Sequence, residues 1–458
     1  MKLALIGGGG VRAPLFVASA LRRAERIGLD EICLMDIDAD KLSVFGALCR
    51  EVARAVGSPV RITSTTDARE AFEGVRYVVT TIRVGGDEGR VFDERIALRH
   101  GVLGQETTGP GGFAMALRSI PAVLGYAELL EKVSPGAWMF NFTNPAGLVT
   151  QALRDNGFHR TVGICDAANE AQFSVARWLN LDSKTLRAEV FGLNHLSWGR
   201  RVTHNGQDLL GPLLRDPGFL SGTMLNVFDP ELVQEVGMWM NEYLYYFHYA
   251  DEAVQKISAE ERTRGEEIRE LNQHLLKQLK SIGVERDPAA ALKAYYGYEA
   301  RRSSTYMYYA RSDAPTPEEA DERAPEAKHG EVGEGYAGVA LSIIEALETG
   351  NPLYTGLNVP NEGAIHCMRP GDVVEVSCVV DRDGIRPLPI GDIPEAQELL
   401  MRSVKRYERL TVEAIMQRSR QKAVMALMAH PLVLSYSLAQ TLVDQYLAAH
   451  APYIGKWQ

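Results

Sequence analysis

The chain has 458 residues, which is enough for a large hydrophobic core and at least two packed units. Hydrophobic residues make up 46% of it and charged residues 24%, a balance that excludes a disordered chain and a membrane-embedded one. With 59 acidic and 49 basic residues the net charge is -10, which disfavours nonspecific binding to nucleic acid or an anionic membrane and favours a small-molecule partner.

Strand-like apolar runs alternate with helical patterns through the first third of the chain. Helices are predicted near residues 11–27 and 40–56, and the second has an apolar stripe at three- and four-residue spacing. Strands are predicted at residues 2–6, 31–36, 60–64, 77–82, 138–142 and 161–164. This alternation predicts an α/β fold in which residues 1–165 form a Rossmann-type, doubly wound parallel sheet.

The pattern becomes mixed after residue 165. Long helices are predicted at residues 259–281, 335–348 and 395–429, and strands at 188–191 and 372–380. We therefore expect residues 166–458 to form a second α/β domain with long C-terminal helices. Residues 313–331 are rich in Glu, Pro and Ala with little to bury, which predicts an exposed loop.

Neither a targeting segment nor a disulfide framework is predicted. The opening MKLALI is too short for the apolar region of a signal peptide, and no run approaches the roughly 20 apolar residues that cross a bilayer. The five cysteines are scattered and lack CxxC spacing. We therefore expect a cytoplasmic protein without a membrane partner.

A glycine turn follows the first predicted strand. Gly8, Gly10 and Ala13 fit the pattern G-x-G-x-x-A, in which free amides and the helix dipole meet a pyrophosphate. Asp36 ends the next strand, where a carboxylate would accept hydrogen bonds from ribose hydroxyls and disfavour NADP. The alternative is a tight turn that binds nothing. We predict an NAD site formed by Gly8, Gly9, Gly10, Val11, Arg12 and Asp36, in which Arg12 would face a cofactor phosphate, a substrate phosphate or solvent.

Further polar segments follow later strands. Residues 104–113, GQETTGPGGF, are too polar for a core element and predict either a ligand loop or a surface connection. Cys165 and His195 could together bind a divalent metal and leave positions open for substrate oxygens, although a buried cysteine and a core histidine are individually commonplace. The tyrosines of residues 242–249 are typical of a core stripe.

Together these segments resemble glycoside hydrolase family 4, the NAD- and metal-dependent glycosidases, and within it the 6-phospho-β-glucosidases. The similarity spans nearly the whole chain. It is carried by IGGGGVRAPL, LMDID, IRVGGDEGR, GQETTGPGG, NFTNPAG, GICD, FGLNHLSW, EYLYYF, RTRGEE and NEGAI.

The resemblance implies a redox elimination mechanism. Cys165 and His195 would ligate a divalent ion, typically manganese, and Tyr243 would be the catalytic base. In this family NAD oxidises C3 of the sugar, the base removes the proton from C2, the aglycone is eliminated, water adds, and the hydride returns to C3. The paired-carboxylate scheme of most glycosidases is therefore not expected.

The resemblance also implies the residues that hold the substrate, a phosphorylated glycoside. Asn144 and Asn194 would contact the sugar near the metal, and Arg90 would help to hold the 6-phosphate. Arg262 and Arg264 of the RTRGEE segment are further candidates for binding the phosphate or for tuning the base. Family likeness further implies a homodimer or homotetramer.

The chain departs from the family at two places. Residue 166 is Asp, whereas many β-specific members carry Asn there and α-specific members carry Asp as a general acid, so Asp166 is a second catalytic candidate. The frequent GGGS opening is GGGG here, so Arg12 would replace a phosphate-binding serine or the phosphate would not be required. A 6-phospho-α-glucosidase, an enzyme for unphosphorylated glycosides, an NAD-dependent hydroxy-acid dehydrogenase and a non-catalytic NAD sensor therefore remain as alternatives.

Overall fold

The computed structural model describes residues 1–322 and 335–458 of the chain. Among these residues, nine strands form the larger of two sheets, in the order β13-β12-β11-β6-β5-β4-β1-β2-β3. The strands are β1 (Lys2–Ile6), β2 (Glu31–Met35), β3 (Arg61–Thr65), β4 (Val75–Thr80), β5 (Trp138–Asn141), β6 (Thr161–Gly163), β11 (Leu353–Pro360), β12 (Val373–Asp381) and β13 (Gly384–Pro387).

The six N-terminal strands run parallel, and β1 lies in the middle of them between β2 and β4. Leu3, Ala4, Leu5 and Ile6 of β1 are fully buried, as expected for a parallel strand that helices cover on both faces. The predicted Rossmann-type, doubly wound sheet is therefore confirmed. Its order reverses between β1 and β4, where ligands bind in sheets of this kind.

Strands from the C-terminal part of the chain extend this sheet. β11 pairs with β6 in the antiparallel direction, with Asn358 opposite Gly163, and β12 and β13 follow as antiparallel neighbours. The domain boundary at residues 165 and 166 stays a prediction. It does not separate two sheets, because the larger sheet uses strands from both sides of it.

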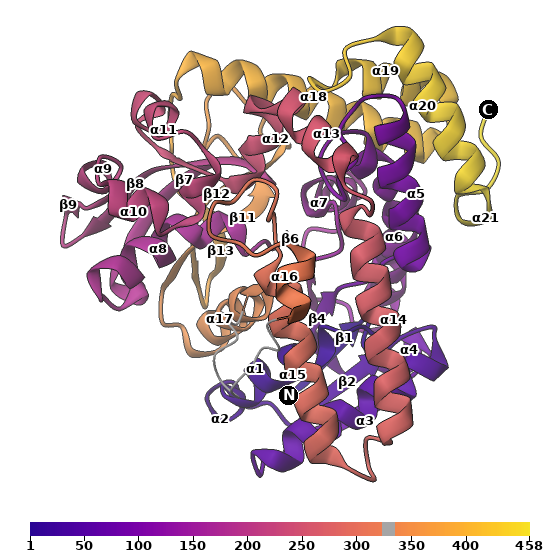
Figure 1. Cartoon of the computed structure of the whole chain (residues 1–458). Coiled ribbons are helices and arrows are strands. Elements are labelled where there is room, and N and C mark those ends of the chain that lie inside the picture. Colours follow the sequence, from indigo (N-terminus) through magenta and orange to yellow (C-terminus); the bar gives the residue numbers. More distant parts are fainter. Residues whose placement is uncertain (323–334) are drawn as a thin grey trace.

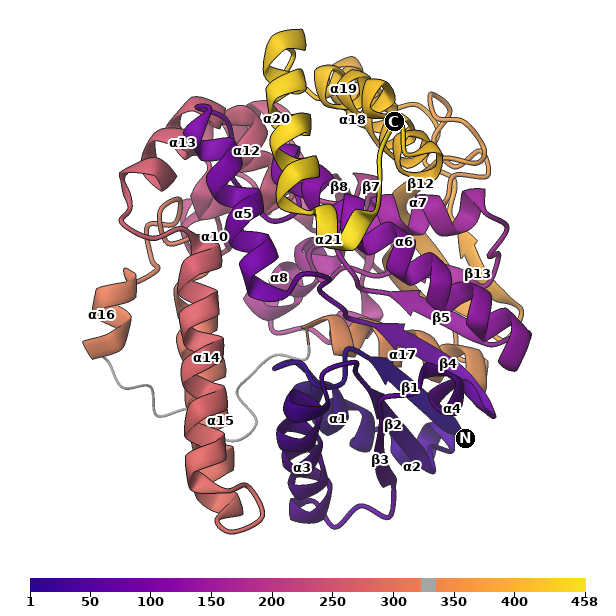
Figure 2. The same cartoon turned by 90° about the vertical axis from the view of Figure 1, so that its right-hand side faces the viewer.

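The second part of the chain adds a smaller sheet and many helices, as the α/β prediction requires. The smaller sheet contains β7 (Arg187–Leu193), β8 (Leu196–His204), β9 (Gln207–Asp208) and β10 (Trp239–Met240), all antiparallel. Figures 1 and 2 show the long helices α14 and α15 side by side next to α3, while α18, α19 and α20 gather at the other end near α5 and α6.

The helices have the following bounds: α1 (Ala13–Leu21), α2 (Ala24–Ile27), α3 (Ala39–Ala55), α4 (Ala68–Phe72), α5 (Gly86–Arg99), α6 (Gly109–Val133), α7 (Ala146–Asp155), α8 (Glu170–Leu179), α9 (Leu210–Leu213), α10 (Pro217–Ser221), α11 (Pro230–Val236), α12 (Tyr245–His248), α13 (Ala250–Ala259), α14 (Arg264–Ile282), α15 (Pro288–Ser304), α16 (Pro317–Glu322), α17 (Gly335–Thr349), α18 (Glu395–Gln417), α19 (Arg420–Ala429), α20 (Tyr436–Ala449) and α21 (Ala451–Ile454).

Two long predicted helices are interrupted for local reasons. The helix expected at 259–281 breaks because the Thr263 side chain accepts from the Glu266 amide and Glu266 accepts from the Thr263 amide, a capping box that starts α14. The helix expected at 395–429 breaks at Arg418, which has a φ of 49°, and the Ser419 side chain caps α19.

The loop predicted at 313–331 is wrong in part. Residues 317–322 form α16, where the Thr316 and Glu319 side chains and amides bond reciprocally. Residues 323–331 of that prediction lie outside the described residues. The helix predicted at 335–348 is confirmed as α17.

Helix α6 is long and apolar enough to cross a membrane by length and composition alone, which the sequence prediction did not identify. However, 67% of its most apolar window is buried inside the protein. Ala114, Ala116, Leu117 and Ile120 belong to the main hydrophobic core. The apolar composition of α6 is therefore that of a core helix.

Candidate active site

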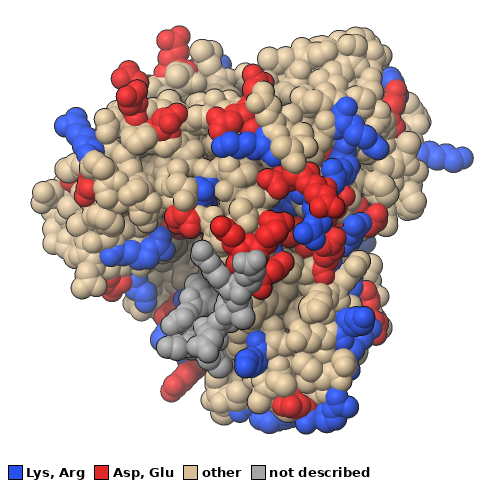
Figure 3. Space-filling model, in the orientation of Figure 1, with Lys and Arg blue, Asp and Glu red and all other residues tan. Residues whose placement is uncertain are grey.

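One cavity of about 1860 Å³ lies at the carboxyl ends of the parallel strands. Its lining includes most of the predicted cofactor and catalytic residues, among them Gly9, Arg12, Asp36, Cys165, His195 and Tyr243, whereas Gly8 is not part of it. Figure 3 shows acidic and basic side chains side by side on one face of the molecule, without a continuous basic field of the kind that binds nucleic acid.

The glycine turn after β1 packs directly against β2. The amides of Gly7 and Gly8 both donate to the Met35 carbonyl at 2.9 Å. A Cβ atom on Gly8 would lie 2.7 Å from Leu34 Cβ and 2.8 Å from Leu34 Cα, so only glycine fits there. Gly8 is therefore fixed by its packing against β2, and Gly7, Gly9 and Gly10 of the same turn line the cavity.

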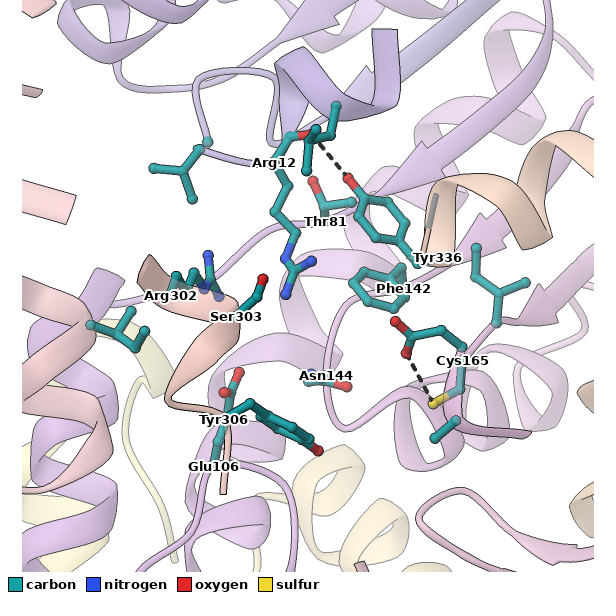
Figure 4. A pocket seen from close by; sticks show the side chains of 18 of the residues that line it. Arg12, Thr81, Glu106, Phe142, Asn144, Cys165, Arg302, Ser303, Tyr306 and Tyr336 are labelled. Atoms are coloured by element: carbon teal, nitrogen blue, oxygen red, sulfur yellow. Dashed lines mark hydrogen bonds between the residues drawn. The ribbon is translucent and has the colours of Figure 1, made fainter. Parts of the chain in front are cut away.

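Asp36 lies beside the turn and organises it. Its Oδ2 accepts a hydrogen bond from the Gly9 amide at 3.0 Å, and its Oδ1 accepts one from the Asp38 amide at 3.1 Å. Val11 and Arg12 follow the turn and also line the cavity. In Figure 4 the Arg12 side chain extends from the turn into the cavity toward Ser303.

Cys165 and His195, the candidate metal ligands, come from different sheets. Cys165 follows β6 and is 4% exposed, whereas His195 lies in the turn between β7 and β8 with a φ of 61° and is 8% exposed. Burial lowers the pKa of His195 to about 4, so its imidazole is neutral and retains a lone pair for a ligand. Both side chains reach the same cavity.

The surroundings of Cys165 are acidic. Burial raises the pKa of its thiol well above the usual value, and the carboxylates of Glu375 and Asp166 raise it further. The Asp166 carboxyl lies on the cavity, with Oδ1 4.0 Å from Cys165 Sγ. No group of three or more His, Cys, Asp or Glu side chains that could hold a metal occurs among the described residues. A thiol and an imidazole amid negative charge fit a divalent cation that takes its other ligands from a substrate or water.

Tyr243 stands against His195. The two rings are stacked with centroids 3.8 Å apart and planes 2° apart. The Asn241 side chain accepts from the Tyr243 amide and so holds the start of the short 3₁₀ helix Glu242–Leu244. Burial, and then the charge of Glu242, raise the pKa of Tyr243 well above its usual value. The phenol therefore needs a nearby cation before it can act as a base.

Arg90 is buried in α5 and already has two acidic partners. Its Nε donates to Glu94 at 2.7 Å, and its Nη1 lies 2.8 Å from Glu106 Oε2. Glu106 also pairs with Arg83. All four side chains contribute to the wall of the cavity, so an anionic ligand at Arg90 would share it with these carboxylates.

The remaining predicted substrate residues differ in position. Asn144 lines the cavity, as Figure 4 shows. Asn194 is directed elsewhere, because its amide donates to Glu375 at 3.3 Å and accepts from the Gly147 amide; it lines a smaller adjacent cavity. Arg262 lies at the cavity with 41% of its side chain exposed and pairs with Glu270.

Several acidic side chains that line this cavity were not predicted from the sequence, among them Glu106 and Glu242. Glu106 lies within the GQETTGPGG segment, whose unusual polarity was the available signal. Glu242 precedes Tyr243 and accepts from the Tyr306 hydroxyl at 3.4 Å, and burial raises its pKa to about 8. Glu242 is the first residue of the EYLYYF segment, but nothing in that segment predicted that its carboxyl would be buried.

Comparison with known proteins covers almost the whole chain. Residues 2–181 match the family described as "Family 4 glycosyl hydrolase", and residues 190–433 match "Family 4 glycosyl hydrolase C-terminal domain". A probable 6-phospho-β-glucosidase of Bacillus subtilis is 30% identical over 99% of this chain and 97% of its own. A 6-phospho-α-glucosidase of Lacticaseibacillus paracasei is also 30% identical, over 98% of this chain and 97% of its own.

Comparison with solved structures shows a similar fold in this family. The 6-phospho-β-glucosidase of Thermotoga maritima, solved with manganese, NAD+ and glucose-6-phosphate, superposes with a TM-score of 0.84 at 27% identity, and the match covers 100% of both chains.

Proposed function

Because the chain belongs to glycoside hydrolase family 4, we propose that it hydrolyses 6-phospho-β-glucosides with NAD and a divalent metal, manganese being the expected ion. The observation that carries this proposal is that one cavity joins Cys165, His195 and Tyr243 to a dinucleotide-type glycine turn. When bound, NAD supplies a reversible hydride acceptor for the sugar, and the metal supplies a Lewis acid for the sugar oxygens.

The cofactor would lie along the glycine turn, with Gly8, Gly9, Gly10, Val11 and Arg12 around its phosphates. Asp36 supports NAD over NADP, because its carboxylate lies beside the turn and would repel a 2′-phosphate. The same carboxylate holds the Gly9 amide, so it would orient the turn as well as the ribose.

Cys165 and His195 would hold the metal. The buried acidic surroundings of the thiol support this, because a bound cation would stabilise the thiolate and so lower the raised pKa of Cys165. A cation on the imidazole would also act on the Tyr243 phenol that stacks against it, and would lower the pKa of that phenol toward the range of a usable base. We propose that Tyr243 then takes the C2 proton of the sugar.

Asn144 and Arg90 are proposed to bind the sugar and its phosphate. Arg90 already forms ion pairs with Glu94 and Glu106. We therefore expect a phosphate there to be bound by further cations of the same cavity as well, including Arg12 and Arg262. Asn194 would act from behind the site, since its amide contacts Glu375 and Gly147.

The proposal is tested with p-nitrophenyl β-glucoside 6-phosphate in the presence of NAD and Mn²⁺. Nitrophenol release should disappear with EDTA and return when Mn²⁺ is restored. Cys165→Ser should abolish metal-dependent turnover while NAD binding persists. Turnover that is unaffected by EDTA, or net accumulation of NADH as in a dehydrogenase, would refute the proposal.

Asp166 keeps a second candidate, the 6-phospho-α-glucosidase, open. Its exposed carboxyl lies on the cavity next to Cys165, where it could donate a proton to a leaving oxygen. The paired α-substrate distinguishes the two: release only from the α-anomer, lost in Asp166→Asn, would assign α-specificity. Paired substrates without the 6-phosphate show whether the phosphate is required.

The cellular setting follows as part of the same proposal. Phosphorylated sugars are retained inside cells, so we propose a cytoplasmic enzyme. We also propose a homodimer or homotetramer, for which the long C-terminal helices are the candidate contacts. Light scattering of the purified protein tests the assembly.

A further inference from the structure

A short hydrogen-bonded loop lies directly behind His195. It comprises residues 104–108, between α5 and α6, and belongs to the GQETTGPGG segment. The Gln105 Oε1 atom accepts from the Thr107 amide at 2.6 Å and from the Thr108 amide at 2.7 Å. Two backbone N–H groups can point only at an acceptor, so the atom that faces them is the carbonyl oxygen of Gln105 and not its NH₂.

Thr107 connects this carbonyl to the imidazole. Its Oγ1 lies 2.8 Å from His195 Nδ1 and 3.1 Å from Gln105 Oε1. A hydroxyl carries one proton and can also accept. Gln105 Oε1 can only accept, so the Thr107 hydroxyl donates its hydrogen bond to Gln105 Oε1. Its oxygen is then free to accept a hydrogen bond from the N–H of His195 Nδ1.

The loop is held in place by the start of α6. A Cβ atom on Gly111 would lie 2.0 Å from the backbone carbonyl oxygen of Gln105, and one on Gly112 would lie 2.1 Å from the backbone carbonyl oxygen of Thr107. The two glycines therefore let the helix backbone pack against the loop backbone. Thr107 is consequently built on a rigid support, which is what a group that orients a ligand requires.

The other ring nitrogen is left for the cavity. His195 Nε2 has no protein hydrogen-bond partner within residues 1–322 and 335–458, while Nδ1 is bound to Thr107. A histidine binds a metal through the nitrogen that carries the lone pair, and a hydrogen bond to the other nitrogen selects the tautomer.

We propose that Thr107 is a positioning residue that, with Gln105 as its acceptor, keeps the proton of neutral His195 on Nδ1 and presents the Nε2 lone pair to a divalent cation. This rests on the proposed function, in which His195 is a metal ligand. The role belongs to Thr107 alone in the pair Thr107–Thr108, because the Thr108 hydroxyl is buried without a hydrogen-bond partner among the described residues.

The first test measures Mn²⁺ affinity of the NAD-bound enzyme by electron paramagnetic resonance, for wild type, Thr107→Val, Thr107→Ser and His195→Ala. Thr107→Val should bind Mn²⁺ roughly 10- to 100-fold more weakly, and Thr107→Ser should stay near wild type because it keeps the hydroxyl. NAD affinity, measured in parallel, should be the same in all four and reports that the site is folded.

A second test reads the tautomer in the wild-type protein without metal. Nitrogen-15 NMR of histidine-labelled enzyme, with His195 assigned from the His195→Ala spectrum, should show a protonated Nδ1 and an unprotonated Nε2. The opposite tautomer, or wild-type Mn²⁺ affinity in Thr107→Val, overturns the role of Thr107. If His195→Ala itself retains Mn²⁺, the metal site of the proposed function fails instead.

Discussion

Replacing Arg118 by Met should unfold the centre of the molecule at lower denaturant concentration. Arg118 of α6 is 1% exposed, and its two Nη atoms donate to the two carboxylate oxygens of Asp93 on α5 at 2.8 and 2.6 Å. It also donates to the carbonyls of Val84 and Ala114 at 3.0 and 2.9 Å. His450 of the C-terminal region lies 2.7 Å from the same carboxylate, so three distant segments meet at one buried charge.

The size of the effect follows from what Arg118→Met leaves behind. Asp93 would remain buried and lose both bonds of the guanidinium fork, with only His450 left beside its carboxylate, for which the expected cost is about 3 to 5 kcal/mol. Arg118→Lys keeps the charge but cannot form the fork, so we expect an intermediate loss of about 1 to 3 kcal/mol. Adding Asp93→Asn to Arg118→Met replaces the buried carboxylate by a neutral amide and should restore part of the loss.

The assay is equilibrium unfolding in urea, followed by circular dichroism and by tryptophan fluorescence. Both signals are needed because a chain of this size need not unfold in one step. Asp93→Asn is also measured alone. If Arg118→Met lies within about 1 kcal/mol of wild type, or if the losses of Arg118→Met and Asp93→Asn simply add in the double variant, Arg118 and Asp93 do not interact as described.

Three further predictions concern the cavity. Gly8→Ala should weaken NAD binding at least about tenfold, equivalent to about 1.4 kcal/mol, because the added Cβ would lie 2.7 Å from Leu34 Cβ. Titration calorimetry measures this affinity. The control Gly125→Ala, which has open space around its Cβ, should bind NAD as tightly as wild type. Asp36→Ala should narrow the preference for NAD over NADP about tenfold in the same titration, and an unchanged ratio would exclude Asp36 from the choice. Burial raises the pKa of Glu242 to about 8, so the folded protein keeps a proton that the unfolded chain releases near pH 4.5. The free energy of unfolding of the metal-free wild type should therefore fall as the pH rises from 5 to 8, by up to about 5 kcal/mol relative to Glu242→Gln. Parallel plots of this free energy against pH for the two proteins would contradict the buried acid.

The N-terminal part of the fold could be predicted because its signals are local. Each parallel strand is a short apolar run, and the glycine turn announces where β1 ends. The pairing of β11 with β6 could not be predicted, since Asn358 and Gly163 are neighbours only in space and periodicity carries no information about which sheet a strand joins.

The candidate site likewise contains residues that the sequence identified and contacts that it could not predict. The resemblance identified Cys165, His195 and Tyr243, and the structure brings all three to one cavity. It could not indicate that Asn194 faces Glu375, because the direction of an amide depends on a partner from a distant strand. Nor could residue spacing reveal that Arg90 is shared between Glu94 and Glu106, a balance of charges that exists only after folding.

The extension of the larger sheet by β11, β12 and β13 has a consequence for biosynthesis. Strand β6, which leads to Cys165, leaves the ribosome long before Leu353, where its neighbour β11 begins. At roughly 5 to 20 residues per second, β6 would remain an unpaired edge for about 10 to 40 seconds. Open edges invite pairing with other chains, so nascent copies on one messenger should be most prone to misassociation during that interval. Strands that are made late in synthesis thus cover the edge that β6 would otherwise expose.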